Sequence, residues 1–416
     1  MRKTLLGIAA AAAIAFTTVA HAELQNVTID GSIQIRANYY GNMERGPLVR
    51  DFQGNVVRPT GAETEHVEQR TRLGVNAEFT DQVSSYIELD NYYWWDGQES
   101  DLSVDIHQAY VQAEEMWNTP LRMRIGRQEL KFGSSWLVGA NESAPGFTGL
   151  SFDAIRATYA TDQISVDAFA SEMFDNSTFS GVYGSYIGQP DMTFDAYWLW
   201  DRNSPRYVDE LDTHTFGLRG AGDVEGLDFE GEVAFQTGDA PRAPRLRDED
   251  YWAANAEVGY TFDTPNNPRI FLGGAWFDGQ DTYKPTIFER LNPFHTPAVI
   301  TSFNRLYSDV YYSEFFGRDL NNVIVGRGGA SIQPTEETEV ELLVSYLRND
   351  EVPSGVDEEL GWEVGLYGTY NYTEDLQFSA GWAHLFAESG VEWRGDTTIE
   401  DDEDPDYVFV ETRLSF

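Results

Sequence analysis

The feature that most constrains the fold is a two-residue alternation of polar and apolar side chains, which recurs from residue 27 to the end of the chain. It is clearest in residues 70–79, where one face reads Arg, Arg, Gly, Asn, Glu and the other Thr, Leu, Val, Ala, Phe. Because successive side chains of a strand point to opposite faces, such a segment has one charged and one apolar face. Lipid on one side and water on the other satisfy both faces, as in a transmembrane β-barrel.

The lengths of the connections also alternate. Short polar turns follow residues 79, 160, 222, 262, 333 and 372, and long irregular segments separate them at 39–69, 133–150, 238–250, 278–320, 349–359 and 387–406. Outer-membrane barrels have short periplasmic turns and long extracellular loops, whereas a soluble β-sandwich has no reason to alternate in this way. The pattern predicts an all-β, antiparallel barrel of about 18 strands, of which the strand at 179–188 has the weakest pattern.

The first 22 residues predict an export signal that is removed from the mature protein. Arg2 and Lys3 give a positive start, residues 5–16 are apolar, and Ala20-His21-Ala22 has the pattern of a cleavage site. The apolar stretch is too short to cross a bilayer as a helix, and no later apolar run approaches the roughly 20 residues that such a helix needs. We therefore expect a signal peptide at 1–22 and a single barrel domain at 23–416.

Three further features agree with the outer membrane of a Gram-negative bacterium. The chain has no cysteine, so nothing indicates a disulfide-stapled secreted domain. Aromatic residues make up 14% of the chain, and barrels use them in girdles at both membrane surfaces. The alternating last segment ends in Phe416, which resembles the signal that the outer-membrane assembly machinery reads. We expect a multi-pass protein of the cell outer membrane.

The charge balance excludes one class of partner. The formal net charge is −41, and loss of the two cations Arg2 and Lys3 with the signal makes it −43. Nucleic-acid binding requires a basic footprint, so no nucleic-acid partner is expected.

Several short segments carry a family resemblance. The clearest is Ile-Gly-Arg-Gln-Glu-Leu-Lys-Phe-Gly at 125–133, which is followed by Leu-Val-Gly at 137–139 and Leu-Ser-Phe-Asp at 150–153. Further matching segments lie at 70–74, 107–112, 213–219 and 254–263. In their order and spacing they resemble the alginate export family of outer-membrane porins, over most of residues 60–416. The resemblance implies an 18-stranded barrel, passage of a polyuronate, and periplasmic export partners beside outer-membrane lipid and lipopolysaccharide.

The alternation assigns charged residues to the lumen. The predicted basic residues of the substrate path are Arg70, Arg72, Arg122, Arg124, Arg127, Lys131, Arg156, Arg219 and Arg413. The predicted acidic wall is Asp228, Glu230, Glu232, Glu257, Glu339, Glu341 and Glu363. Most of the arginines are on early strands and these acids on later ones, so the two groups should face each other across the barrel. The acids are unexpected in a conduit for a polyanion, and the resemblance therefore supports the fold better than the solute.

Each candidate site has a plainer alternative. The luminal arginines can serve only to solvate a wet lumen, and Arg127 and Lys131 can pair with Glu129 or with acids on neighbouring strands. The acidic run at 400–404 contains Asp401, Asp402 and Asp404, which are weak candidates for binding Ca²⁺ or Mg²⁺. A solvated loop is the alternative, since the run lacks the spacing of an EF-hand. His107, His214 and His384 are scattered, and we take none of them as a metal ligand.

No motif of a hydrolase, metalloprotease or nucleotide-binding enzyme occurs, so we predict a protein that is not an enzyme and has no cofactor. The function predicted is passive diffusion of an anionic, alginate-like polysaccharide or of small anionic solutes through an outer-membrane channel. A general or cation-tolerant porin, and a structural or adhesion barrel, are the alternatives. Luminal charge distinguishes the first two, and a lumen plugged by apolar residues would favour the third.

Overall fold

The computed structural model describes residues 24–43, 49–50, 56–57, 65–95, 103–143, 145–173, 177–203, 211–239, 248–281, 300–318, 320–394 and 404–416. The predicted signal peptide, together with Asp401 and Asp402, lies outside these residues. Among the residues described, no helix has the length and apolar character that crossing a membrane requires.

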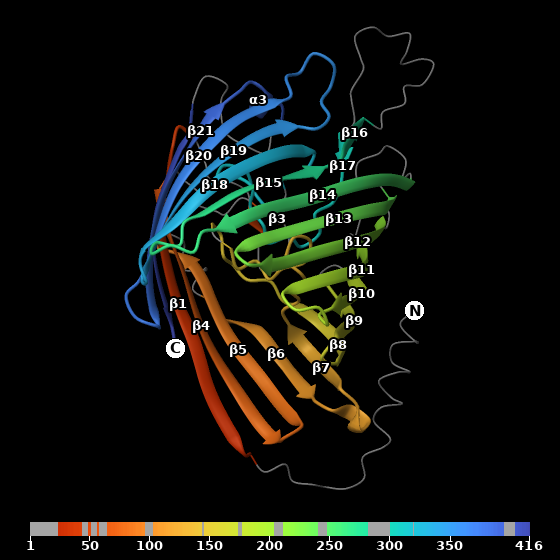
Figure 1. Cartoon of the computed structure of the whole chain (residues 1–416). Helices are drawn as coiled ribbons and strands as arrows, with labels where there is room; N and C mark the ends of the chain where they lie inside the picture. The colour runs from red at the N-terminus through yellow and green to blue at the C-terminus, as the bar shows by residue number, and fades with distance from the viewer. Residues whose placement is uncertain are drawn as a thin grey trace.

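Eighteen strands form one antiparallel sheet that closes into a barrel (Figure 1). They are β1 (Asn26–Gly41), β4 (Glu65–Thr80), β5 (Val83–Trp94), β6 (Asp105–Ala113), β7 (Leu121–Gln128), β8 (Phe152–Ala160), β9 (Ile164–Glu172), β10 (Thr178–Tyr186), β11 (Met192–Asn203), β12 (Leu211–Val224), β13 (Leu227–Asp239), β14 (Asp248–Thr261), β15 (Arg269–Phe277), β18 (Val323–Thr335), β19 (Thr338–Asn349), β20 (Glu359–Asn371), β21 (Leu376–Ala387) and β22 (Asp406–Ser415). Each pairs with its neighbours along the chain, and the pairing of β1 with β22 closes the ring. The predicted fold is confirmed, including the weakest strand, which is β10.

The remaining elements are small. The pair β2 (Val49–Arg50) and β3 (Val56–Val57) and the pair β16 (Gly279–Asp281) and β17 (Ile300–Ser302) form two-stranded sheets. A single 3₁₀ turn covers Met116–Asn118, and the short helix α3 covers Gly390–Arg394.

The two faces of the wall differ as the alternation predicts. Along β4 the side chains of His66, Glu68, Arg70 and Arg72 are buried inside the barrel. The outer face instead carries large apolar side chains that the protein leaves exposed, among them Leu272 at 68%. A contiguous apolar outer surface is stable in contact with lipid and not in water.

The two rims of the barrel are unlike. Eight short turns join strands at one rim, called the turn end here, and β1 begins and β22 ends at the same rim. Nine longer connections join strands at the other rim, the loop end.

Two of these connections fold into the lumen. Inner loop A (residues 129–151) follows β7, and inner loop B (residues 303–322) precedes β18. β7 therefore ends at Gln128, where the chain leaves the wall. The loops join through backbone hydrogen bonds from Gly139 N to Tyr307 O (2.8 Å) and from Tyr307 N to Leu137 O (2.9 Å).

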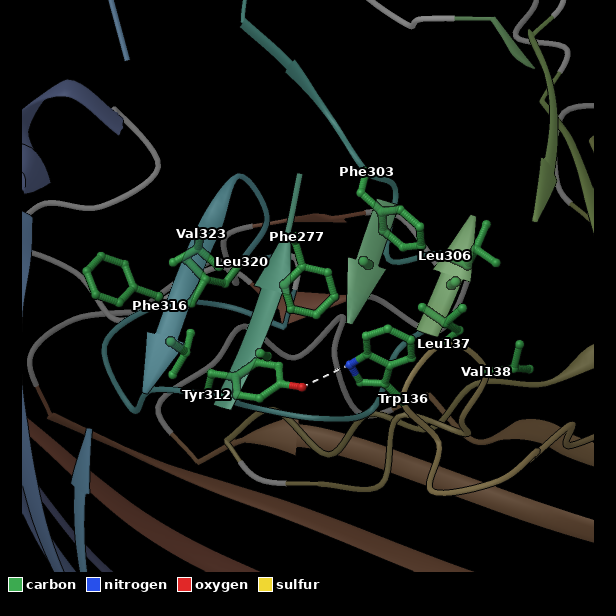
Figure 2. Close-up of a cluster of buried hydrophobic side chains, with 14 of the residues drawn as sticks. Trp136, Leu137, Val138, Phe277, Phe303, Leu306, Tyr312, Phe316, Leu320 and Val323 are labelled. Carbon is green, nitrogen blue, oxygen red and sulfur yellow. Dashed lines mark hydrogen bonds between the residues drawn. The ribbon is translucent and has the colours of Figure 1, made fainter. Parts of the chain in front are cut away.

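A hydrophobic core lies between the inner loops and the wall (Figure 2). Trp136 of inner loop A packs near Phe277 of β15, and its Nε1 donates a hydrogen bond to the Tyr312 hydroxyl of inner loop B at 2.9 Å. Figure 2 shows this bond among the other core side chains, namely Leu137, Val138, Phe303, Leu306, Phe316, Leu320 and Val323. Burial of this apolar surface stabilises the loops inside the barrel.

Candidate functional site

Strand parity places most of the predicted charged residues in the lumen. Of the predicted basic residues, those that point inward from the described strands are Arg70, Arg72, Arg122, Arg124, Arg156, Arg219 and Arg413. All seven predicted acidic residues, Asp228, Glu230, Glu232, Glu257, Glu339, Glu341 and Glu363, also point inward. Their contribution to solute passage stays a prediction, but their contacts divide them into separate groups.

Arg127 is a correction to the predicted lumen, because it lies on the outer face of β7. It pairs in register with Asp153 of β8, and its Nε lies 3.8 Å from the Asp153 carboxylate. The neighbour of Asp153 in the chain, Phe152, points inward, where its ring meets Tyr307 of inner loop B at 5.2 Å. Since adjacent residues of a strand point to opposite faces, Asp153 and Arg127 point outward.

Lys131 lies on inner loop A. Its Nζ is 2.9 Å from Glu129 Oε2, and its side chain is about half exposed.

Arg72 is the centre of a buried group of charges. It is within ion-pair distance of four carboxylates: Glu142 (2.8 Å), Asp90 (3.2 Å), Glu129 (3.3 Å) and Glu88 (3.5 Å). Two of these acids are on β5 and two on inner loop A, so the guanidinium ties the loop to the wall. Removal of one partner from such a buried group leaves uncompensated charge, which is strongly destabilising.

Arg70 makes a second attachment of the same kind. Its side chain is 1% exposed, its Nη2 is 2.8 Å from Glu142 Oε2, and its Nη1 donates to Phe147 O at 2.9 Å. Burial would raise the pKa of Glu142, but Arg70 and Arg72 lower it below its ordinary value. Both β4 arginines therefore hold inner loop A in place.

His107 belongs to the same group, although no sequence motif predicted this. Its Nε2 lies 2.8 Å from Glu129 Oε1 and its Nδ1 lies 3.1 Å from Ser151 Oγ. Burial would raise the pKa of Glu129, but the His107 hydrogen bond and the nearby charges of Lys131 and Arg72 lower it to about 2. Glu129, His107 and Arg72 come from inner loop A, β6 and β4, and no local motif could have brought these segments together.

Glu88, His107 and Glu129 have the geometry of a metal-ligand set, since their ligand atoms lie within 4.8 Å of one another. Arg72 already supplies positive charge there, because its guanidinium lies 3.3 Å from Glu129 and 3.5 Å from Glu88. These residues fit an ion-pair network better than a metal centre.

Further luminal arginines also have carboxylate partners. Arg156 pairs with Asp167 at 2.8 Å, and Arg219 pairs with Asp195 and Glu230, each at 2.8 Å. The predicted lists missed two arginines, which neutralise part of the acidic wall. They are Arg269, whose Nε donates to Asp228 at 2.9 Å, and Arg327, which lies 2.7 Å from Glu257.

Two members of the predicted acidic wall are covered by other side chains and by inner loop B, and are therefore not open to the lumen. Glu363 accepts hydrogen bonds from Ser313 Oγ and, at 3.1 Å, from Glu314 N, both of inner loop B. Glu232 accepts one from the Tyr197 hydroxyl at 2.6 Å. These carboxylates are buried and support the lumen, so they do not line an open path.

The β7 pair, Arg122 and Arg124, is different. Arg124 donates to Gln112 at 2.8 Å and lies 4.2 Å above the Tyr110 ring, and among the described residues no carboxylate lies within 4 Å of it. Arg122 reaches Glu114 only at 4.0 Å, and both side chains are 39% exposed. The pair is adjacent to Arg156, which is opposite Arg124 in register. Because Arg156 is neutralised by Asp167, the positive charge open to the lumen is that of the β7 pair.

The β19 pair, Glu339 and Glu341, is the negative counterpart. Within the described chain neither has an ion pair, and both point inward close to the turn end, as the β7 pair does. β7 is the fifth and β19 the fifteenth of the eighteen strands, so the two pairs lie on nearly opposite walls. Open charges of opposite sign across a lumen give a transverse electric field.

Arg413 lies inward on β22, close to the turn end, and is exposed. Asp404 is exposed, and its Oδ1 accepts a hydrogen bond from Ala387 N at 2.9 Å, so it holds the end of β21. The Ca²⁺ or Mg²⁺ role for the acidic run stays a prediction, because Asp401 and Asp402 are not among the described residues.

The sequence and the fold were compared with known proteins. The sequence profile of the Alginate export family matches residues 26–356. A search of curated sequences found no match. The fold is similar to that of three solved proteins of Pseudomonas aeruginosa. For OccK8 (OprE) the TM-score is 0.59 and the identity 12%, with coverage of 94% of this chain and 98% of that chain. For OprD the TM-score is 0.58, the identity 9% and the coverages 95% and 97%, and for OccK5 (OpdH) the TM-score is 0.57, the identity 12% and the coverages 93% and 98%.

Proposed function

Because the chain belongs to the alginate export family and has the fold of outer-membrane porins, we propose that it is a passive diffusion channel for small anionic solutes and short anionic oligosaccharides. It spans the outer membrane with its turn end in the periplasm and its loop end outside. The family's name and the absence of any catalytic motif both favour a conduit over an enzyme.

The observation that carries the proposal is the open β7 pair. Most luminal arginines are already neutralised by carboxylates a few ångströms away, whereas Arg124 is not, and Arg122 is only weakly paired. A guanidinium that is open to water attracts a passing carboxylate and can bind it through two hydrogen bonds. An anion can therefore follow the β7 wall despite the negative charge of the whole protein.

The inner loops restrict the size of the solute. They fill lumen space toward the loop end with a packed core in which Trp136, Leu137 and Leu306 are each 1–3% exposed. A rigid constriction of this kind favours single small molecules or an extended chain over bulky, branched solutes. This supports small anions and short, linear uronates more strongly than a thick polymer.

A cation-tolerant general porin is the second candidate, and the β19 pair favours it. Glu339 and Glu341 offer cations a path on the opposite wall. In that case a transverse field orients dipolar solutes and selects weakly between ions of opposite sign.

The reversal potential in a salt gradient across a planar bilayer tests the proposal. Arg122→Gln with Arg124→Gln should lower the anion-to-cation permeability ratio about two- to fivefold, because one charge in a watery lumen contributes roughly 1 kcal/mol or less. Arg127→Gln is the matched control, since it removes an arginine of the same strand from the outer face. It should leave the ratio unchanged.

Glu339→Gln with Glu341→Gln should shift the ratio in the opposite direction. A wild-type channel that already prefers cations, and loses that preference in this acid variant alone, would establish the cation-tolerant porin instead.

A further inference from the structure

The turns that form the turn end carry only one sign of charge. Its eight turns cover residues 81–82, 114–120, 161–163, 187–191, 225–226, 262–268, 336–337 and 372–375, all of which the structure describes. Each turn contains at least one Asp or Glu, and none contains Lys, Arg or His. Three turns carry adjacent acids: Glu114–Glu115, Glu336–Glu337 and Glu374–Asp375. The carboxylates therefore surround the whole mouth of the barrel.

These charges stay open to solvent. The side chains of Glu336, Glu337, Glu374 and Asp375 are exposed, and within the described chain none of them has an ion pair. The only turn carboxylate within ion-pair range of a cation is Glu114, at 4.0 Å from Arg122. Turn geometry explains some of the aspartates, because Asp is a common turn residue, but it does not explain the glutamates.

The described part of the loop end differs. It mixes both signs of charge, as in the ion pair between Arg348 and Glu358. Arg394 of α3 lies at the same end. The asymmetry between the two mouths is therefore a property of the molecule as folded and not only of its acidic composition.

We infer that the turn end acts as an electrostatic filter, which concentrates cations at one mouth and makes conductance depend on the direction of the voltage. The inference rests on the proposed channel but not on its proposed preference for anions. Fixed charge at a mouth acts over about one Debye length, roughly 8 Å at physiological salt and roughly 30 Å at 0.01 M.

The direction of the effect follows from the position of the charge. When the turn end is positive, cations enter from a mouth that is rich in them, while anions arriving from the loop end are held back at that mouth. Both ions accumulate in the lumen and conductance rises. The opposite voltage drives both ions out of the lumen, where neither is replaced quickly, and conductance falls.

Single-channel current in symmetrical KCl tests this. At low salt the wild type should conduct better with the turn end positive. The current ratio, defined as the current with the turn end positive divided by the current at the opposite voltage, should fall to unity in 1 M KCl, where the Debye length is roughly 3 Å. Glu336→Gln with Glu337→Gln should lower the ratio at low salt, and addition of Glu374→Gln with Asp375→Asn should lower it further. Glu388→Gln with Glu392→Gln is the control, since it removes two exposed carboxylates from the loop end. This control should not lower the ratio.

Because the chain has no cysteine, a single introduced cysteine allows a more specific test of the same inference. In Glu337→Cys, a sulfonate-bearing methanethiosulfonate restores a negative charge and a trimethylammonium-bearing one adds a positive charge on the same backbone. Reaction from only one chamber also identifies which chamber the turn end faces. The anionic adduct should keep the wild-type ratio and the cationic adduct should reduce it.

Equal current ratios for the two adducts, or an equal loss of rectification in the loop-end control, would overturn the inference. These outcomes are separable from failure of the proposed function, because they are measured without a salt gradient. Loss of anion preference in the β7 variants leaves the rectification test intact.

Discussion

A luminal arginine is not by itself a contact for solute, and burial decides which of two roles it has. Arg70 and Arg72 are 1% and 8% exposed and both pair with Glu142 of inner loop A, so they fix this loop to the wall. Arg122 and Arg124 extend from a strand of the same barrel into open lumen. The residue type is the same in both cases, and the burial of the side chain separates support from selectivity.

The hydrogen bond between Trp136 and Tyr312 gives a prediction at this scale. Tyr312→Phe removes the acceptor and should cost about 1 kcal/mol, whereas Trp136→Phe also leaves a cavity and should cost about 2–4 kcal/mol. The double variant should cost about 1 kcal/mol less than the sum of the two, because the bond can be lost only once. Protection of the inner loops from protease in detergent, measured across a denaturant series, gives the three values. Strict additivity would mean that the bond contributes nothing.

At the scale of elements, sequence predicts the strands and not the folding of the inner loops. A strand can be predicted locally, since its two-residue alternation is visible within about ten residues, and this alternation predicted the eighteen-stranded barrel. Parity could also have placed Arg127 outside, on the same face as Ile125, although its motif grouped it with Lys131. The inner loops instead depend on contacts between distant segments. Asp309, for example, accepts hydrogen bonds from the backbone of Glu142 (2.8 Å) and Ser143 (3.0 Å), and no pattern within either loop encodes that pairing.

Asp309 also makes the rigidity of the inner loops testable. Asp309→Ala leaves two partly buried N–H groups of inner loop A without their acceptor and removes the counter-charge of Arg318, 3.4 Å away. The loops should lose about 2–4 kcal/mol of stability and close the channel transiently more often, which single-channel recording detects as added noise.

Asp357→Ala is the matched control for this change. Asp357 also accepts two hydrogen bonds, from Glu359 N (3.1 Å) and Ser389 Oγ (2.8 Å), but it lies in an exposed connection at the loop end. It should leave the noise unchanged. A similar rise in both variants would show that the inner loops are not the source of the closures.

At the scale of the whole molecule, closure of the sheet predicts resistance to detergent. Each of the eighteen barrel strands has two neighbours, so the barrel sheet leaves no backbone edge free to take up detergent or another chain. The unheated protein should migrate on a detergent gel as a compact band and shift on boiling, with circular dichroism dominated by β structure. A reducing agent should change neither band, since the chain has no cysteine. Recovery of the protein as soluble periplasmic material would contradict the barrel.

The seam between β1 and β22 has a consequence for biogenesis. Ten register pairs, from Ser32 with Ser415 to Gly41 with Asp406, join the first strand to the last. β22 is synthesised after the other seventeen barrel strands, so β1 acquires its second neighbour only after all of them have been made. A chain without β22 has two edge strands whose backbone N–H and C=O groups find no hydrogen-bond partners in lipid. The architecture thereby makes synthesis of β22 a condition for a closed and stable barrel.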